Sequence, residues 1–179
     1  FDVIVLRSCW DYPWRENEFR DWLQIADRET RVVNPVEVVS WNLHKGYLLD
    51  LQQAGVPVVP TRLLEAGCHE EGLCKILDEQ AWDQYVIKPA ISAGSWLTAL
   101  FGSNDLPAAR QFVLQHGQDR DLLVQPYIRS VESGGERANV YLGGRFSHSV
   151  TKRPRFRGED EQVGEAQEVL PEDTLIGEQ

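Results

Sequence analysis

Near the middle of the chain, a lysine and a loop of small residues have the pattern of a phosphate site. Lys88 ends the β-branched and aromatic run 85–87, and Pro89 follows it. The loop Ser92-Ala93-Gly94-Ser95 comes next, with side chains short enough for backbone N–H groups to reach a ligand. A fixed cation beside such N–H groups favours a polyanion, most commonly a nucleotide phosphate. The residues alone equally allow a β-hairpin with a surface lysine.

Further cations lie at two other places in the chain. Lys45 is expected in the first turn of a helix that Asn42 caps. A cation is unfavourable there, because the N-terminus of a helix is the positive end of its dipole, unless an anion shares the site. Residues 152–157 contain four cations, including Lys152 and Arg153. Both features fit either an anion site or an ordinary solvated surface, and the residues do not decide between the two.

A polar and aromatic cluster follows the first predicted strand. Arg7, Trp10 and Asp11 lie where that strand ends, and in open α/β sheets ligands collect at this edge. Arg7 and Asp11 could hold a zwitterionic or carboxylate substrate, or they could pair with each other.

The composition is that of a globular protein and excludes some functions. The net charge is −10, and eight of the 28 acidic residues lie in 158–179, which contains no lysine or arginine. An acidic chain is a poor general binder of nucleic acid, and no apolar run approaches the ~20 residues of a membrane span. Three cysteines without framework spacing favour a reducing compartment, so we expect a cytoplasmic protein.

Alternating helices and strands must position these residues, so we expect an α/β or α+β fold. Apolar periodicity and turn residues predict strands at 1–6, 31–33, 85–88, 96–101 and 122–128, and a hairpin at 138–142 and 145–151. Residues 133–136 are expected to form a turn. Helices are expected from Glu16 with Phe19, Trp22, Leu23 and Ala26 on the core face, after Asn42 up to Gly55, over about 70–79, and between Asp105 and Gly117.

The order of these motifs resembles the ATP-grasp superfamily. The motifs are Trp41-Asn42-x-x-Lys45, Gly55-Val56-Pro57, Pro60-Thr61, Val86-Ile87-Lys88-Pro89, Leu123-Val124-Gln125-Pro126-Tyr127-Ile128 and Gly135-Glu136. The chain is most similar to the branch with glutathione synthetase and the ribosomal-protein glutamate ligases. Arg7-Ser8-x-Trp10-Asp11-Tyr12 and Phe146-Ser147-His148-Ser149-Val150-x-Lys152 look especially like the cycloserine-forming enzymes. The resemblance covers about residues 2–157.

The resemblance implies a nucleotide held between two α+β subdomains. Lys45 and Lys88 match the two lysines that hold the α- and β-phosphates, and the loop Ser92-Ala93-Gly94-Ser95 matches the one that folds over them. The strand Gln125-Pro126-Tyr127-Ile128 matches the hinge whose backbone reads the adenine edge. Glu136 matches the acidic residue that holds the ribose hydroxyls.

The implied reaction is phosphoryl transfer from ATP to a carboxylate, followed by attack of an amine or a related nucleophile on the acyl phosphate. Lys152 or Arg153 matches the catalytic cation that faces the γ-phosphate or the acyl phosphate. We assign Arg7, Trp10 and Asp11 to a small amino-acid-like or peptide substrate. The family's Mg²⁺ ligands lie near the C-terminus, whereas residues 153–179 offer acids in a loop-like tail and no Asn. We therefore expect the metal ligands beyond this sequence, and no ligase activity from the 179-residue piece alone.

The implied domains are the end of a Rossmann-like pre-ATP-grasp domain at 1–40, a first ATP-grasp subdomain at 41–128, and an incomplete second one at 129–179. The expected partners are ATP and a small molecule, with no nucleic acid and no membrane, and a homo-oligomer remains open. One alternative function is a non-catalytic ATP-binding regulatory module of the same fold. Another is a carbohydrate or peptide binder that uses the six tryptophans.

Overall fold

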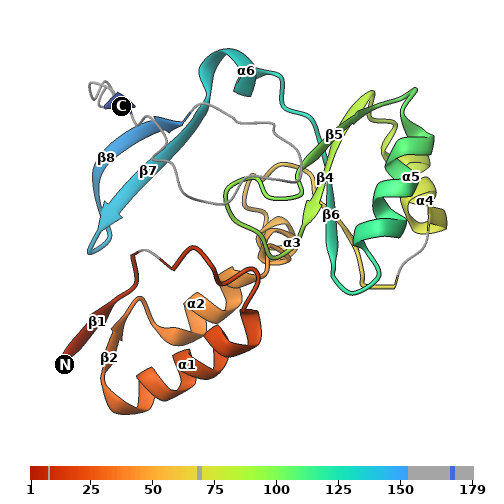
Figure 1. The fold of residues 1–179 in the computed structure, drawn as a ribbon. Helices are drawn as coiled ribbons and strands as arrows, with labels where there is room; N and C mark the ends of the chain where they lie inside the picture. Colours follow the sequence, from red (N-terminus) through yellow and green to blue (C-terminus); the bar gives the residue numbers. More distant parts are fainter. Residues whose placement is uncertain (8, 68–69, 153–169, 172–179) are drawn as a thin grey trace. The chain divides into compact units, whose positions relative to one another are not determined.

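The chain forms two compact units, Phe1–Tyr127 and Ile128–Gln179, each with sheets of its own (Figure 1). The structure is a computed structural model that describes residues 1–7, 9–67, 70–152 and 170–171. Helices and strands are mixed along the chain, and antiparallel sheets predominate. The α+β class predicted from the sequence is confirmed, whereas the domain boundaries at 40/41 and 128/129 stay a prediction.

The N-terminal segment folds as the predicted β–α–β piece. Strand β1 (Val3–Val5) pairs in parallel with β2 (Arg31–Val33), and helix α1 (Glu16–Glu29) connects them. Apolar side chains from both kinds of element meet in one small core. Its buried members are Leu23, Ala26, Val32, Val36 and Leu43.

Two expectations for this segment are wrong in detail. Strand β1 is not buried, because Val3 and Val5 are 47% and 59% exposed. Successive strand residues face opposite sides of a sheet, and here only Ile4 packs on the core. Trp22 is 39% exposed, since it lies beside the core face of α1, and it stacks on Phe19 with ring centroids 5.8 Å apart.

The region up to Gly55 forms two helices where one was predicted. They are α2 (Val36–Leu43) and α3 (Tyr47–Gln53). Asn42 therefore lies within α2 and caps no helix. Three apolar residues of α2 recur at helical spacing and pack on the N-terminal core: Val36, Val39 and Leu43. This packing stabilises the unpredicted helix. Gly55 ends the region with φ +77°, as expected of a glycine after a helix.

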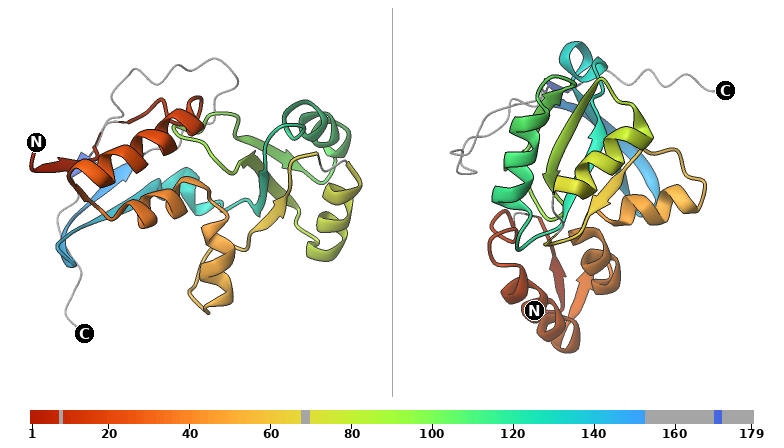
Figure 2. Two further views of the ribbon diagram at one scale, coloured as in Figure 1. Left: turned by 90° about the horizontal axis from the view of Figure 1, so that it is seen from below. Right: turned by 90° about the vertical axis from the view of Figure 1, so that its right-hand side faces the viewer.

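A four-stranded antiparallel sheet follows, in the order β3-β6-β4-β5. Helices α4 (Glu70–Gln80) and α5 (Leu106–His116) lie side by side on one face of it (Figure 2). Between them and the sheet lies the larger core, which includes Tyr85, Ile87, Val113, Leu122 and Val124, each at most 1% exposed. The strands are β3 (Arg62–Leu64), β4 (Gln84–Pro89), β5 (Ala99–Gly102) and β6 (Leu122–Pro126).

The returning strand β5 begins three residues later than predicted. The expected start at Trp96 lies between Ser95 and Leu97, which have φ +63° and +50°. A positive φ belongs to turns rather than to a strand, so the chain bends twice before β5 can pair with β4. The unpredicted strand β3 pairs with β6 and makes β6 an inner strand.

The second unit is built around one hairpin. Strands β7 (Glu136–Leu142) and β8 (Arg145–Lys152) pair antiparallel around Gly143-Gly144, as predicted. Both glycines have positive φ, +58° and +77°, which a two-residue type I′ turn requires. A short helix, α6 (Ser130–Gly134), overlaps the predicted turn, and β9 (Leu170–Pro171) pairs with β8.

Within the ranges that the structure describes, no helix is both long and apolar enough to cross a lipid bilayer. The predicted loop-like tail lies, apart from β9, outside the described residues.

Candidate functional site

Lys45 lies in the turn between α2 and α3 and points at the small-residue loop. Its backbone N–H donates to the Ala90 carbonyl at 2.8 Å. Its ammonium group donates to the Ser92 carbonyl oxygen at 2.6 Å and to the Ser92 hydroxyl at 3.1 Å. The lysine and the loop, 47 residues apart in sequence, are therefore parts of one site.

Ser92 is the residue by which this loop is attached. It is only 6% exposed, and its hydroxyl donates to the Pro89 carbonyl at 3.2 Å. Beyond it the chain turns through Gly94 and Ser95, both in the left-handed region with φ +60° and +63°. Such backbone costs roughly 1 kcal/mol or more at a residue other than glycine, and conformations of this kind cluster at ligand sites.

The environment of Lys45 disfavours the charged form of its ammonium group. Burial, and then the nearby charge of Lys88, lower the pKa of the Lys45 ammonium from 10.5 to about 8. Lys88 itself lies on β4 opposite Leu123 of β6, one residue before Pro89 ends the strand. The two lysines that the sequence singled out are thus close enough to repel each other.

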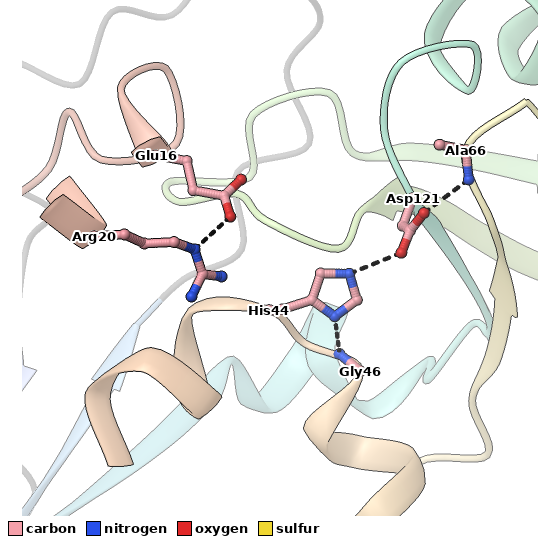
Figure 3. A network of polar contacts seen from close by, with 6 residues as sticks. All are labelled: Glu16, Arg20, His44, Gly46, Ala66 and Asp121. Carbon is pink, nitrogen blue, oxygen red and sulfur yellow. Dashed lines mark hydrogen bonds and ion pairs between the residues drawn. The ribbon is translucent and has the colours of Figure 1, made fainter. Parts of the chain in front are cut away.

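Next to Lys45, His44 makes a set of polar contacts that sequence reasoning missed (Figure 3). Its Nε2 lies 3.1 Å from an oxygen of Asp121, and its Nδ1 accepts the Gly46 N–H at 3.1 Å. Asp121 accepts the Ala66 N–H at 2.7 Å through its other carboxylate oxygen, and its backbone carbonyl accepts the Ala90 N–H. Because Nδ1 is an acceptor, the ring proton lies on Nε2 and is donated to the carboxylate.

These contacts fix the turn that carries Lys45. A Cβ atom at Gly46 would lie 2.6 Å from Nδ1 of His44, so this position needs a glycine. The sequence gives no sign of the contact, since His44 and Asp121 are 77 residues apart.

A cavity of about 500 Å³ lies beside the flanks of the loop. Its wall includes His44 and the loop neighbours Ile91 and Trp96. Trp14 meets Trp96 edge to face at 5.5 Å between ring centroids, and the Arg120 guanidinium lies 5.2 Å from the centre of the Trp96 ring.

The three predicted substrate residues have different described surroundings. Arg7 lines a cavity of about 380 Å³ together with Tyr12 and Asn42. Asp11 makes its ion pair with Arg15, at 3.3 Å. Trp10 is 56% exposed. The assignment of Arg7, Trp10 and Asp11 to a substrate stays a prediction.

The predicted adenine hinge begins inside the sheet. Gln125 is 7% exposed, and its side-chain amide donates to the hydroxyl of the fully buried Thr61 at 2.8 Å. The Tyr127 N–H donates to the Gln84 carbonyl at 2.9 Å, and Pro126 ends β6. Ile128 begins the second unit. The backbone role proposed for these residues stays a prediction, whereas the Gln125 side chain clearly serves the core.

In the second unit, two predicted site residues lie opposite each other. Glu136 begins β7 and pairs in register with Lys152, the last residue of β8. Glu136 is exposed. Arg153 lies outside the described residues. The ribose and catalytic roles given to Glu136, Lys152 and Arg153 stay predictions.

Candidate metal ligands do not cluster in the part of the chain that the structure describes. No three His, Cys, Asp or Glu side chains there gather closely enough to hold a metal ion. The groups that do meet at the loop are two lysines, which would repel a cation. The expectation that the Mg²⁺ ligands lie beyond this sequence stays a prediction.

Comparison with known proteins shows which proteins this chain is similar to. Residues 1–34 match the family model described as "D-cycloserine synthetase DcsG, N-terminal domain". Over 157 residues the chain is 31% identical to the cycloserine biosynthesis protein DcsG of Streptomyces lavendulae, covering 85% of this chain and 52% of that protein. The crystal structure of D-cycloserine synthetase DcsG is similar with a TM-score of 0.78 and 29% identity, over 85% of this chain and 52% of the other.

Two more distant structures show the same fold. The RimK domain protein ATP-grasp from Sphaerobacter thermophilus matches with a TM-score of 0.58 and 22% identity, over 75% of this chain and 50% of the other. The N5-carboxyaminoimidazole synthetase from Staphylococcus aureus, complexed with ADP, matches with a TM-score of 0.54 and 11% identity, over 83% of this chain and 40% of the other. The chain therefore has the fold of ATP-grasp proteins and is similar in sequence to DcsG.

The chain spans about half the length of the DcsG sequence and structure that it matches. The resemblance stated from the motifs is therefore confirmed at the level of the superfamily. The activity, substrates and partners of the whole protein are proposals.

Proposed function

We propose that this ATP-grasp relative binds ATP through Lys45 and Lys88 and belongs to a ligase that joins a small carboxylate to an amine or a related nucleophile. The observation that carries the proposal is the pair of lysines at the Ser92 loop. One of them is largely buried, and its pKa is lowered to about 8 partly by the other. A polyanion would favour the charged form of a lysine in this environment, and perturbed groups of this kind mark functional sites.

The described contacts support specific roles around the phosphates. An ammonium group has three donors, and Ser92 takes two of those on Lys45, so one remains for a phosphate oxygen. Lys88, from the strand that leads into the loop, would supply the second charge. The backbone of Ala93, Gly94 and Ser95 would contact the phosphates, because left-handed residues turn successive N–H groups towards one point.

The remaining assignments follow the family resemblance. Gln125, Pro126, Tyr127 and Ile128 would read adenine through backbone groups, and Glu136 would hold the ribose. Lys152 or Arg153 would face the reacting phosphoryl group. ATP would supply the phosphoryl group that activates the carboxylate as an acyl phosphate. The residues of the chain would contribute charge neutralisation and positioning, and no nucleophilic side chain is needed.

Titration with ADP tests the nucleotide site. Wild-type protein is expected to bind ADP, and Lys88→Ala is expected to weaken binding by about 1.5–3 kcal/mol, the contribution of a charge-assisted hydrogen bond. Lys75→Ala is the matched control, because Lys75 is an exposed lysine on α4. Equal affinity in all three proteins would exclude Lys88 from the site.

A non-catalytic ATP-binding module is the second candidate. Release of phosphate from ATP by the whole protein, measured with Mg²⁺ and a pool of amino acids, separates the two functions, whereas the 179-residue piece alone is expected to release none in either case. Release above the Lys88→Ala background supports a ligase, whereas ADP and ATP binding without release supports the module.

A further inference from the structure

One carbonyl group in the loop receives hydrogen bonds from two distant parts of the chain. The Ser92 carbonyl oxygen accepts the Lys45 ammonium at 2.6 Å and the Tyr12 hydroxyl at 3.2 Å. Tyr12 lies 80 residues before Ser92. A carbonyl oxygen has two lone pairs, so the two donors use its full capacity.

Tyr12 is firmly attached to the N-terminal β–α–β piece. Its ring packs against the core of that piece and lies 5.9 Å from the Phe19 ring, centroid to centroid. Its own carbonyl accepts the Arg15 N–H in the turn before α1. Burial raises the pKa of the Tyr12 hydroxyl, which therefore keeps its proton and remains a donor at neutral pH.

We infer that Tyr12 is a positioning residue for the phosphate loop: its hydroxyl fixes the Ser92 carbonyl and, through it, the Lys45 ammonium. The loop is thereby attached to the N-terminal piece at its first residue, Ser92. Without Tyr12, Ser92 would keep its bonds to Lys45 and Pro89 but lose its only described contact with the segment after β1.

This attachment has a functional consequence, which rests on the proposed function. Tyr12 directly follows Asp11, the last of the residues proposed for the substrate. A nucleotide that holds the loop in place would then also restrain the substrate segment. Coupling between two sites is reciprocal, so substrate binding should raise nucleotide affinity by the same factor that nucleotide raises substrate affinity.

Hydrogen exchange without nucleotide tests the attachment itself. Tyr12→Phe keeps the ring that packs on Phe19 and removes only the hydroxyl, so the variant should fold. We expect backbone exchange in residues 90–98 to become about two- to tenfold faster, the effect of one lost hydrogen bond on local opening. Tyr141→Phe, on β7, loses a tyrosine hydroxyl at an exposed position and should leave this segment unchanged.

Two comparisons separate positioning from a general structural role. Ser92→Ala removes the hydroxyl but keeps the carbonyl, so Tyr12→Phe should still speed up exchange in a Ser92→Ala background. Exchange in α1 and β2 should not change. An unchanged segment 90–98, or exchange that rises equally in α1, β2 and the loop, would overturn the inference.

ADP titration of the same variants tests the consequence. We expect Tyr12→Phe to lower ADP affinity about two- to tenfold while the midpoint of thermal unfolding stays near that of Tyr141→Phe. Full ADP affinity in Tyr12→Phe would overturn the positioning role. If wild-type protein binds no ADP but Tyr12→Phe still loosens residues 90–98, the proposed function fails and the attachment stands.

Discussion

Raising the pH should weaken nucleotide binding, because it deprotonates the Lys45 ammonium group. In the free protein the pKa of Lys45 is about 8, and a bound phosphate would raise it, because a nearby negative charge favours the ammonium form. Binding then takes up a proton whenever Lys45 starts out neutral. Affinity should be constant well below pH 8 and fall as the pH rises through 8, towards one factor of ten per pH unit.

The magnitude follows from the fraction of Lys45 that carries its proton. With a pKa of about 8, roughly three quarters is charged at pH 7.5 and about a tenth at pH 9. ADP affinity should therefore drop about eightfold between these two values. Calorimetric titration at half-unit steps, in buffers of equal ionic strength, measures the profile and the proton uptake.

Two variants identify the group that titrates. Lys45→Met should bind ADP more weakly at pH 7.5 and should lose the fall between pH 7.5 and pH 9. Lys88→Ala should move the fall to higher pH, because it removes the second cause of the lowered pKa. A fall of equal size and position in wild type and Lys45→Met would refute the reasoning.

Three further outcomes follow from the described contacts. Gln125→Ala should lower the free energy of unfolding by about 1–3 kcal/mol in urea titrations, since it leaves a buried cavity and removes the donor to Thr61, and unchanged stability would contradict this role. Gly46→Ala should weaken ADP binding at least as much as His44→Ala, because its Cβ would collide with the imidazole that holds the Lys45 turn, and full affinity in both would show that the turn needs no such support. Glu136→Ala should bind ATP and its dideoxy form alike, whereas equal binding of both by wild type would remove the ribose assignment.

Local rules predicted most elements, and they failed where distant segments decide the structure. The hairpin around Gly143-Gly144 and the strand before Lys88 were predictable, because turn chemistry and periodicity are local. Strand β3 was missed, since its three residues are too few to show an apolar periodicity. Its partner strand β6 also lies far along the chain, with Leu63 opposite Leu123. The His44 contact with Asp121 was missed for the same reason.

Several departures from ordinary local chemistry meet at one place in the fold, and this supports the site more strongly than any motif does. Lys45 is a lysine held largely out of water beside a second lysine, and Ser95 is a non-glycine residue in left-handed backbone. The Ser92 carbonyl binds Lys45 directly and lies three residues before Ser95. Each departure costs stability, and a chain retains such costs mainly where function requires them. A phosphate group would offset the largest of them, because it neutralises Lys45 and Lys88 together.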